Sequence, residues 1–187
     1  MARIAIPEVL DEDLPDEVRD NADALVNVFR MMLRSPRIAT LVVELGSAQF
    51  GSGVLPGVDR ELAILTCGAC FGSAYEASQH EQISGAVGVS AAQRAAIAVG
   101  QYDSPDLSPA QRALVAFVAA IAEAPTVPDD VFDAVQLHYS DQQVVEAVIL
   151  TGYYFLIARV TTVLEVPQDP REGDAVLRAG VSVNSDQ

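Results

Sequence analysis

The sequence of 187 residues is poor in the residue types that build disulfide frameworks, metal sites and nucleic-acid interfaces. It contains two cysteines, two histidines and no tryptophan. Two cysteines do not make a disulfide framework, and without further Cys or His at zinc-finger spacing we expect no metal site. Basic residues are also scarce, since 11 Lys and Arg stand against 26 Asp and Glu, for a net charge of −15. Such a surface repels phosphate backbones and anionic lipid, so we expect neither nucleic acid nor membrane as a partner.

Long uncharged runs are missing as well. The first residues, Met-Ala-Arg-Ile-Ala-Ile-Pro-Glu, lack the apolar core of a signal peptide, which favours a cytoplasmic location. The most apolar segment follows Glu146 and is interrupted at Arg159. Its uncharged run is shorter than the ~20 residues that a spanning helix requires, so we interpret it as a buried helix.

What the sequence does contain is a helical pattern along most of its length. Apolar residues recur at helical spacing, whereas the alternation typical of strands is rare, which predicts an all-α fold. Serines that precede a proline, or that lie three residues before a glutamine, mark helix starts at Ser35, Ser90, Ser108 and Ser140.

Two stretches resemble one another and predict a duplicated helical unit. Leu55-Pro-Gly-Val-Asp-Arg-Glu-Leu in the first half corresponds to Leu107-Ser-Pro-Ala-Gln-Arg-Ala-Leu in the second. Ala113 occupies the position that Glu61 occupies in the first copy. We therefore expect the first copy to hold the functional residues and the second to be scaffold.

The chemically richest stretch runs from Glu61 to His80. Gly72 and Ser73 are a plausible break and N-cap, which would place Glu76 and His80 at i and i+4 of the helix that follows. Side chains at this spacing lie about 40° apart around the axis and can meet. A carboxylate beside an imidazole suits general acid–base catalysis, and the helix N-terminus favours an anionic substrate. Glu61 could relay a proton if the two helices pack as a hairpin.

Three motifs surround these residues: Arg60-Glu61-Leu-x-Ile-Leu, Tyr75-Glu76-x-x-x-His80 and Ala86-Val-Gly88-Val-Ser90. Together they resemble the central motif of the carboxymuconolactone decarboxylase and alkylhydroperoxidase D (AhpD) family. The resemblance implies an all-helical fold that assembles as a homo-oligomer, a trimer or hexamer, with active sites near subunit interfaces. It covers residues 27–167, with a first unit at about 27–100, a second at about 107–167, an N-terminal arm at 1–26 and a loose tail at 168–187.

The family has a peroxidase branch and a decarboxylase branch. The peroxidase branch uses Cys-x-x-Cys-x-x-x-His, but the two cysteine positions fall on Ser73 and Glu76, while His80 takes the family His and Glu61 the upstream Glu. The resemblance therefore favours a decarboxylase-like acid–base enzyme that needs no cofactor and acts on a small carboxylate or lactone. In that reading His80 shuttles a proton, Glu76 orients or tunes it, and Glu61 assists.

Several alternatives stay open. Cys67 and Cys70 lie six residues before the family cysteine positions and could form an unconventional dithiol of a peroxiredoxin-like enzyme, or be small buried hydrophobes. Glu76 could merely complete a capping box with Ser73, and Ser73 could donate a hydrogen bond in a pocket. Tyr75 could pack or reach a ligand with its hydroxyl. A chain that has kept the fold but lost catalytic activity would be a catalytically silent oligomeric binding protein.

Overall fold

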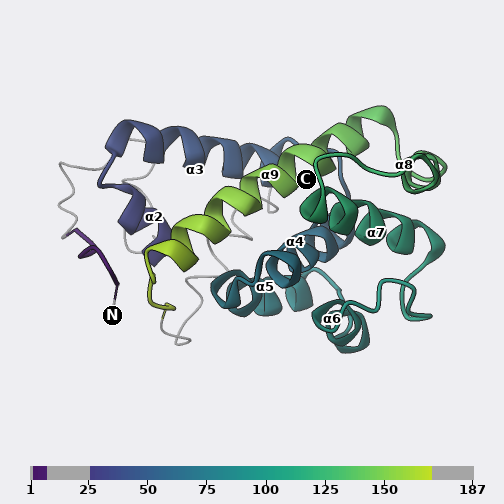
Figure 1. The fold of residues 1–187 in the computed structure, drawn as a ribbon, viewed down its shortest axis with the longest axis horizontal. Helices are drawn as coiled ribbons and strands as arrows, with labels where there is room; N and C mark the ends of the chain where they lie inside the picture. The colour runs from purple at the N-terminus through teal and green to yellow at the C-terminus, as the bar shows by residue number, and fades with distance from the viewer. Residues whose placement is uncertain (1, 8–25, 170–187) are drawn as a thin grey trace. The chain divides into compact units, whose positions relative to one another are not determined.

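The computed structural model describes residues 2–7 and 26–169, and within these ranges all regular secondary structure is α-helical. The prediction of an all-α chain is confirmed. Most of the expected N-terminal arm and of the expected tail lies outside the described residues. The helices are α2 (Asn27–Met32), α3 (Pro36–Gly51), α4 (Gly57–Phe71), α5 (Ala74–Ala86), α6 (Ala91–Ala98), α7 (Pro109–Glu123), α8 (Asp129–Gln136) and α9 (Asp141–Val163) (Figure 1).

The chain divides into two compact units, one of which consists of residues 53–158. The other is made by the described residues up to Ser52 and from Arg159 onward. In this second unit Arg3 pairs with Glu165 at 2.9 Å, and the backbone amide of Asn27 donates to the Asp169 carboxylate at 2.9 Å. The division follows spatial contacts, and the predicted duplication of 27–100 by 107–167 stays a prediction.

Helices start after the serine in all four predicted places, and in three of them the serine side chain caps the helix. Ser90 and Ser108 form complete capping boxes, and Ser140 exchanges the same two bonds with the glutamine three residues later. Ser35 occupies the N-cap position of α3 but makes no side-chain cap bond. The Pro36 ring that follows it still fixes a backbone angle suited to the first helical residue.

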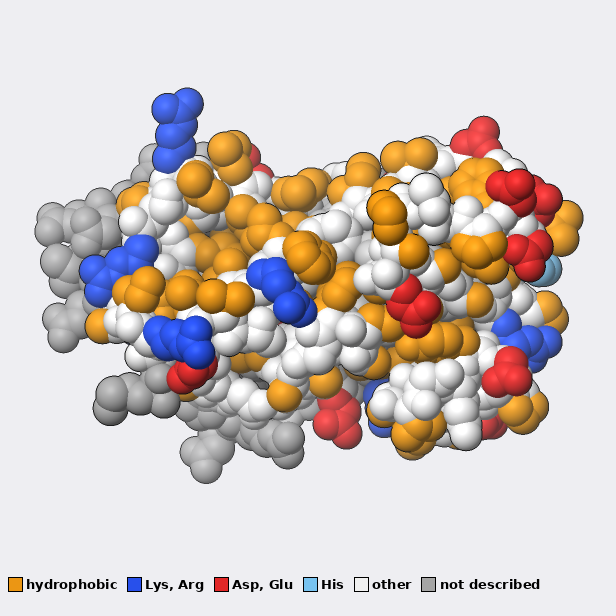
Figure 2. All heavy atoms as spheres, in the orientation of Figure 1, with side chains coloured by type: hydrophobic (Ala, Val, Ile, Leu, Met, Phe, Trp, Pro, Cys, Tyr) orange, Lys and Arg blue, Asp and Glu red, His pale blue; other side chains and the backbone are white. Residues whose placement is uncertain are grey.

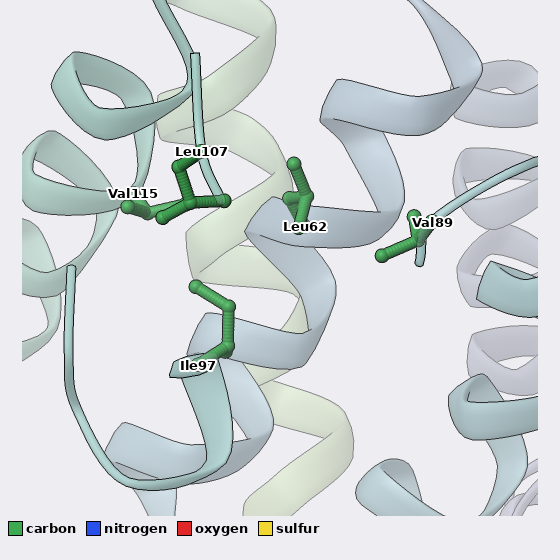
Figure 3. Packing of buried hydrophobic residues seen from close by; sticks show 5 residues of the cluster. All are labelled: Leu62, Val89, Ile97, Leu107 and Val115. Carbon is green, nitrogen blue, oxygen red and sulfur yellow. The ribbon is translucent and has the colours of Figure 1, made fainter. Parts of the chain in front are cut away.

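Helix α4 is the central element of the unit formed by residues 53–158. It packs against α5, α6 and α7, and its buried residues lie all around its axis rather than on one face. Figure 3 shows Leu62 of α4 in a cluster with residues of α6, α7 and the segments that precede them: Val89, Ile97, Leu107 and Val115. A polar side chain on α4 is therefore held in the interior of this unit.

Asp59 in the first turn of α4 ties this helix to later parts of the chain. Its Oδ2 accepts a hydrogen bond from the Tyr139 hydroxyl at 3.0 Å, and its Oδ1 accepts one from the Gln111 side-chain amide at 3.3 Å. Gln111 in turn accepts from the Gln93 side chain at 3.1 Å. These bonds connect the first turn of α4 to α6, α7 and the segment before α9.

Helix α9 is buried on one face only, which corrects the interpretation of its segment as a buried helix. By length and composition it could cross a membrane, and half of its most apolar window is buried in the protein. Large apolar side chains on its other face are exposed: Val145, Val148, Ile149, Phe155 and Leu156. Figure 2 shows that hydrophobic side chains (orange) are frequent on one face of the molecule.

Candidate active site

The helices α4 and α5 form a hairpin around Gly72 and Ser73. Gly72 ends α4 in the left-handed conformation, with φ +65°, and the Ser73 hydroxyl oxygen accepts from the amide of Glu76 at 3.3 Å. The two helices approach closely, because a Cβ on Gly68 would lie 3.5 Å from the backbone nitrogen of Ala77. This hairpin, which the proton-relay hypothesis required, brings the predicted site residues of the two helices together.

Glu61 of α4 and His80 of α5 form a buried pair. Oε2 of Glu61 lies 2.8 Å from Nδ1 of His80, and the two residues are 0% and 6% exposed. Burying two ionisable groups costs free energy unless they bond to each other, and a charged pair of this length is among the stronger hydrogen bonds. In this pair Nδ1 is the ring nitrogen that faces Glu61.

Glu76 lies on the other side of the imidazole. Its Oε2 is 3.8 Å from Nε2 of His80 and the residue is 4% exposed, so the two side chains are close without a hydrogen bond. Oε1 of Glu76 and Oε1 of Glu61 are buried and have no hydrogen-bond partner among the described residues. The capping box predicted with Ser73 is not formed, since the Ser73 amide donates to the Gly68 carbonyl instead.

Tyr154 of α9 completes the group and was not predicted from the sequence. Its hydroxyl lies 3.1 Å from Nε2 of His80, and the two rings meet edge to face at 5.3 Å and 81°. The residues are 74 positions apart, and a tyrosine in an apolar helix is usually a packing residue. The available signal is the Tyr153-Tyr154 pair in the sequence, which does not indicate contact with the histidine.

The surroundings of Glu76 and His80 raise the pKa of both side chains. Burial raises the pKa of Glu76 from its ordinary 4.5 to about 7, against a smaller lowering by His80. Burial alone would lower the pKa of His80, but the charge of Glu61, its hydrogen bond and the charge of Glu76 together raise it above 6.5. Burial and the charges of Glu61 and Glu76 raise the pKa of Tyr154 well above its ordinary value of 10.

The two cysteines are free and differ in their surroundings. Cys67 is fully buried and its thiol bonds to Thr151; burial raises its pKa far above the ordinary 9.0, which disfavours a reactive thiolate. Cys70 is half-buried, with its Sγ 3.4 Å from the Tyr102 hydroxyl. The reading of Cys67 as a small hydrophobe fits these surroundings better than a redox role.

The remaining predicted residues have structural positions. Ser73 is 1% exposed and caps α5, and Tyr75 is buried on the same helix at 5% exposed. Contact of either side chain with a ligand stays a prediction. Within residues 2–7 and 26–169 there is no cluster of three or more His, Cys, Asp or Glu side chains arranged to hold a metal ion.

An open hollow of about 310 Å³ lies beside the ends of α4 and α7 and the middle of α9. Its walls are mostly apolar and include Phe71, Pro125 and Phe155, together with the polar Thr151. Glu61, Glu76 and His80 do not line it. The carboxylates thus converge on His80 as the acid–base hypothesis expects, whereas this hollow lies away from the imidazole.

Comparisons with known proteins identify the fold. No family model matches the sequence, and no curated protein is significantly similar to it. Among solved structures, an AhpD-core, peroxidase-related protein from Ralstonia eutropha JMP134 superposes with a TM-score of 0.78 at 21% identity, covering 96% of both chains. A peroxidase-related protein from Silicibacter sp. TM1040 gives 0.76 at 15% identity, covering 90% of this chain and 92% of its own.

A third similar structure is a debrominase variant, with cysteine changed to alanine, in complex with 2,3,4-tribromopyrrole. It gives a TM-score of 0.76 at 17% identity and covers 98% of this chain and 100% of its own. At such identities a common fold is shown and a common activity is not. The chain therefore has the all-helical, AhpD-like fold that the motifs around His80 predicted.

Proposed function

We propose that this protein is a cofactor-independent acid–base enzyme that acts on a small carboxylate or lactone. The observation that carries the proposal is the buried trio of Glu61, His80 and Glu76, with a 2.8 Å bond on one side of the imidazole and a carboxyl 3.8 Å away on the other. Ionisable groups held in the interior with perturbed pKa values are more frequent at catalytic sites than elsewhere. Acid–base catalysis works best when such values lie near the working pH.

Each residue has a role in this proposal. His80 carries the proton, because the charge and the hydrogen bond of Glu61 raise the pKa of the imidazole against the effect of burial and so favour its charged form. Glu61 holds the ring by Nδ1 and balances its charge. Glu76, with a pKa of about 7, can exist in either protonation state, and its charge changes the proton affinity of His80 from the Nε2 side. A carbanion or enolate formed from a carboxylate or lactone would be protonated here.

Uptake of solvent deuterium tests this function without a known product. We expect the wild-type chain in D₂O to introduce deuterium into, or release CO₂ from, at least one member of a panel of small unsaturated lactones and β-keto acids, followed by NMR. Replacing His80 with glutamine should lower that rate by about 10²–10⁴, as for loss of a general acid–base group. The exposed His138→Gln variant is the matched control and should keep the wild-type rate.

Two outcomes would contradict the proposal. Equal rates in wild type and His80→Gln would mean that the imidazole takes no part in the exchange. No exchange with any member of the panel would favour the silent binding protein, in which the buried trio is structural.

A thiol peroxidase is the second candidate, favoured by the descriptions of the Ralstonia and Silicibacter structures as peroxidase-related. In this chain it would have to use Cys67 and Cys70, of which Cys67 is fully buried. Peroxide turnover with a dithiol reductant that is lost in a Cys67→Ala, Cys70→Ala double variant would establish this function instead.

We also propose that the chain associates with itself, as the family resemblance implies. The exposed apolar face of α9, which includes Val145, Ile149 and Phe155, supports this proposal, because large exposed apolar patches are typical of interaction sites. A cytoplasmic location stays a prediction from the sequence.

A further inference from the structure

Both ring nitrogens of His80 are occupied by groups of the protein itself. Nδ1 lies 2.8 Å from Glu61, and Nε2 lies 3.1 Å from the hydroxyl of Tyr154. The nearer oxygen of Glu76 is 3.8 Å from Nε2, beyond hydrogen-bond range. A proton can therefore pass directly between His80 and a substrate only if one of the two bonds is first broken.

The Tyr154 hydroxyl is the group that can extend this chain of bonds. A charged imidazole donates from both nitrogens, so that Glu61 accepts from Nδ1 and the phenolic oxygen of Tyr154 accepts from Nε2. The hydroxyl hydrogen is then left to donate elsewhere. Across residues 2–7 and 26–169 the structure shows no second hydrogen-bond partner for this hydroxyl.

We propose that the Tyr154 hydroxyl, rather than the imidazole of His80, exchanges the proton with the substrate, and that the Glu61–His80 pair behind it supplies and takes back that proton. The inference rests on the proposed function and deepens it by naming a further catalytic residue. The group that takes the proton is the carbanion or enolate of the proposed function, which can accept a hydrogen bond from a neutral phenol.

The protonation step is balanced within the site. The Nε2–H bond of the imidazolium breaks as its proton passes to the phenolic oxygen, and the O–H bond of Tyr154 breaks as its own proton passes to the substrate anion. Tyr154 ends as a neutral phenol, His80 as a neutral imidazole and the substrate as a protonated product. The charges of Glu61 and Glu76 oppose a free phenolate, so the two transfers have to be concerted. Deprotonation of the next substrate runs the same path in reverse.

The test compares two tyrosines whose hydroxyl groups each make one hydrogen bond to a side chain, buried for Tyr154 and part-buried for Tyr139. Tyr154→Phe removes the hydroxyl beside His80, and Tyr139→Phe removes one that bonds to Asp59 away from the trio. In the deuterium-exchange reaction we expect Tyr154→Phe to lower kcat by at least about 100-fold, with KM changed less than about threefold. Tyr139→Phe should keep both constants within about threefold, although it loses a comparable bond.

The outcomes separate this inference from the proposed function. If the wild-type chain exchanges deuterium and the Tyr154→Phe variant keeps the same kcat, the role of Tyr154 is overturned and the acid–base function is not. A wild-type chain without exchange overturns both. Should Tyr154→Phe fail to fold, a fluorinated tyrosine at position 154 keeps the hydroxyl and lowers its pKa; it should change kcat, and an unchanged kcat would overturn the inference.

Discussion

The wild-type chain should lose stability as the pH rises from 5 to 7, and replacing Glu76 with glutamine should remove most of this loss. Burial raises the pKa of this carboxyl from 4.5 in the unfolded chain to about 7 in the folded one. The folded state therefore binds the proton more tightly, so this contribution is complete below pH 4.5 and is lost as the pH rises through 7. The shift corresponds to about 3 kcal/mol of free energy of unfolding, measured by urea denaturation across the pH range.

An exposed carboxyl on the same helix provides the control for this measurement. Glu81→Gln also removes one negative charge from α5, but from its surface. This variant should keep the wild-type slope of stability against pH, whereas Glu76→Gln should be flatter and more stable than wild type at pH 8. A Glu76→Gln variant that loses stability as steeply as wild type would show that the carboxyl is not held neutral in the folded protein.

Replacing Glu61 with glutamine should lower the free energy of unfolding by about 3–5 kcal/mol at pH 6. The change leaves the buried imidazole of His80 without the charge that raises its pKa. Because that pKa lies above 6.5 in the folded protein, the contribution of His80 is complete below pH 6.5 and is lost as the pH rises through the folded value. The difference between wild type and variant should therefore be largest below pH 6.5, and urea titrations at pH 6 and pH 9 measure it.

A double-mutant cycle distinguishes the pair from two separate effects. If Glu61 and His80 stabilise each other, the Glu61→Gln, His80→Gln double variant should cost clearly less stability than the two single variants added together. Additive losses would mean that each side chain contributes through other neighbours and that the 2.8 Å contact has little net energy.

The parts of the site that were predictable from sequence depend on local rules. The turn at Gly72, the cap at Ser73 and the meeting of Glu76 with His80 follow from residue type and from spacings of three or four positions. The hairpin of α4 and α5 follows from the short turn between them. These features are set by neighbours in the chain, so a sequence contains them directly.

The rest of the site depends on contacts between distant segments. The approach of Tyr154 to His80 results from the packing of α9, and no spacing rule connects residues 74 positions apart. The protonation states depend on burial, and an acidic residue on α4 looks like a surface residue until that helix is found to be covered on all sides. At Ser35 the sequence correctly predicts the start of a helix, but the serine side chain makes no cap bond there.

The cysteines and α9 show how composition can mislead. Cys67 and Cys70 share one motif in the sequence, yet one thiol is fully buried and the other half-buried, because positions three apart on a helix need not meet the same neighbours. The apolar run of α9 predicts a buried helix, but hydrophobicity alone does not reveal which face a helix presents to the core.

The titration of His80, followed by NMR of the wild-type chain with His138→Gln for assignment, tests the central claim most directly. If the carboxylate of Glu61 stabilises the charged imidazole of His80, the pKa of His80 should lie above 6.5, and it should fall when Glu61 is replaced with glutamine. An imidazole that titrates at or below 6.5 in wild type, or whose pKa does not change in Glu61→Gln, would contradict the account of this site as an acid–base centre.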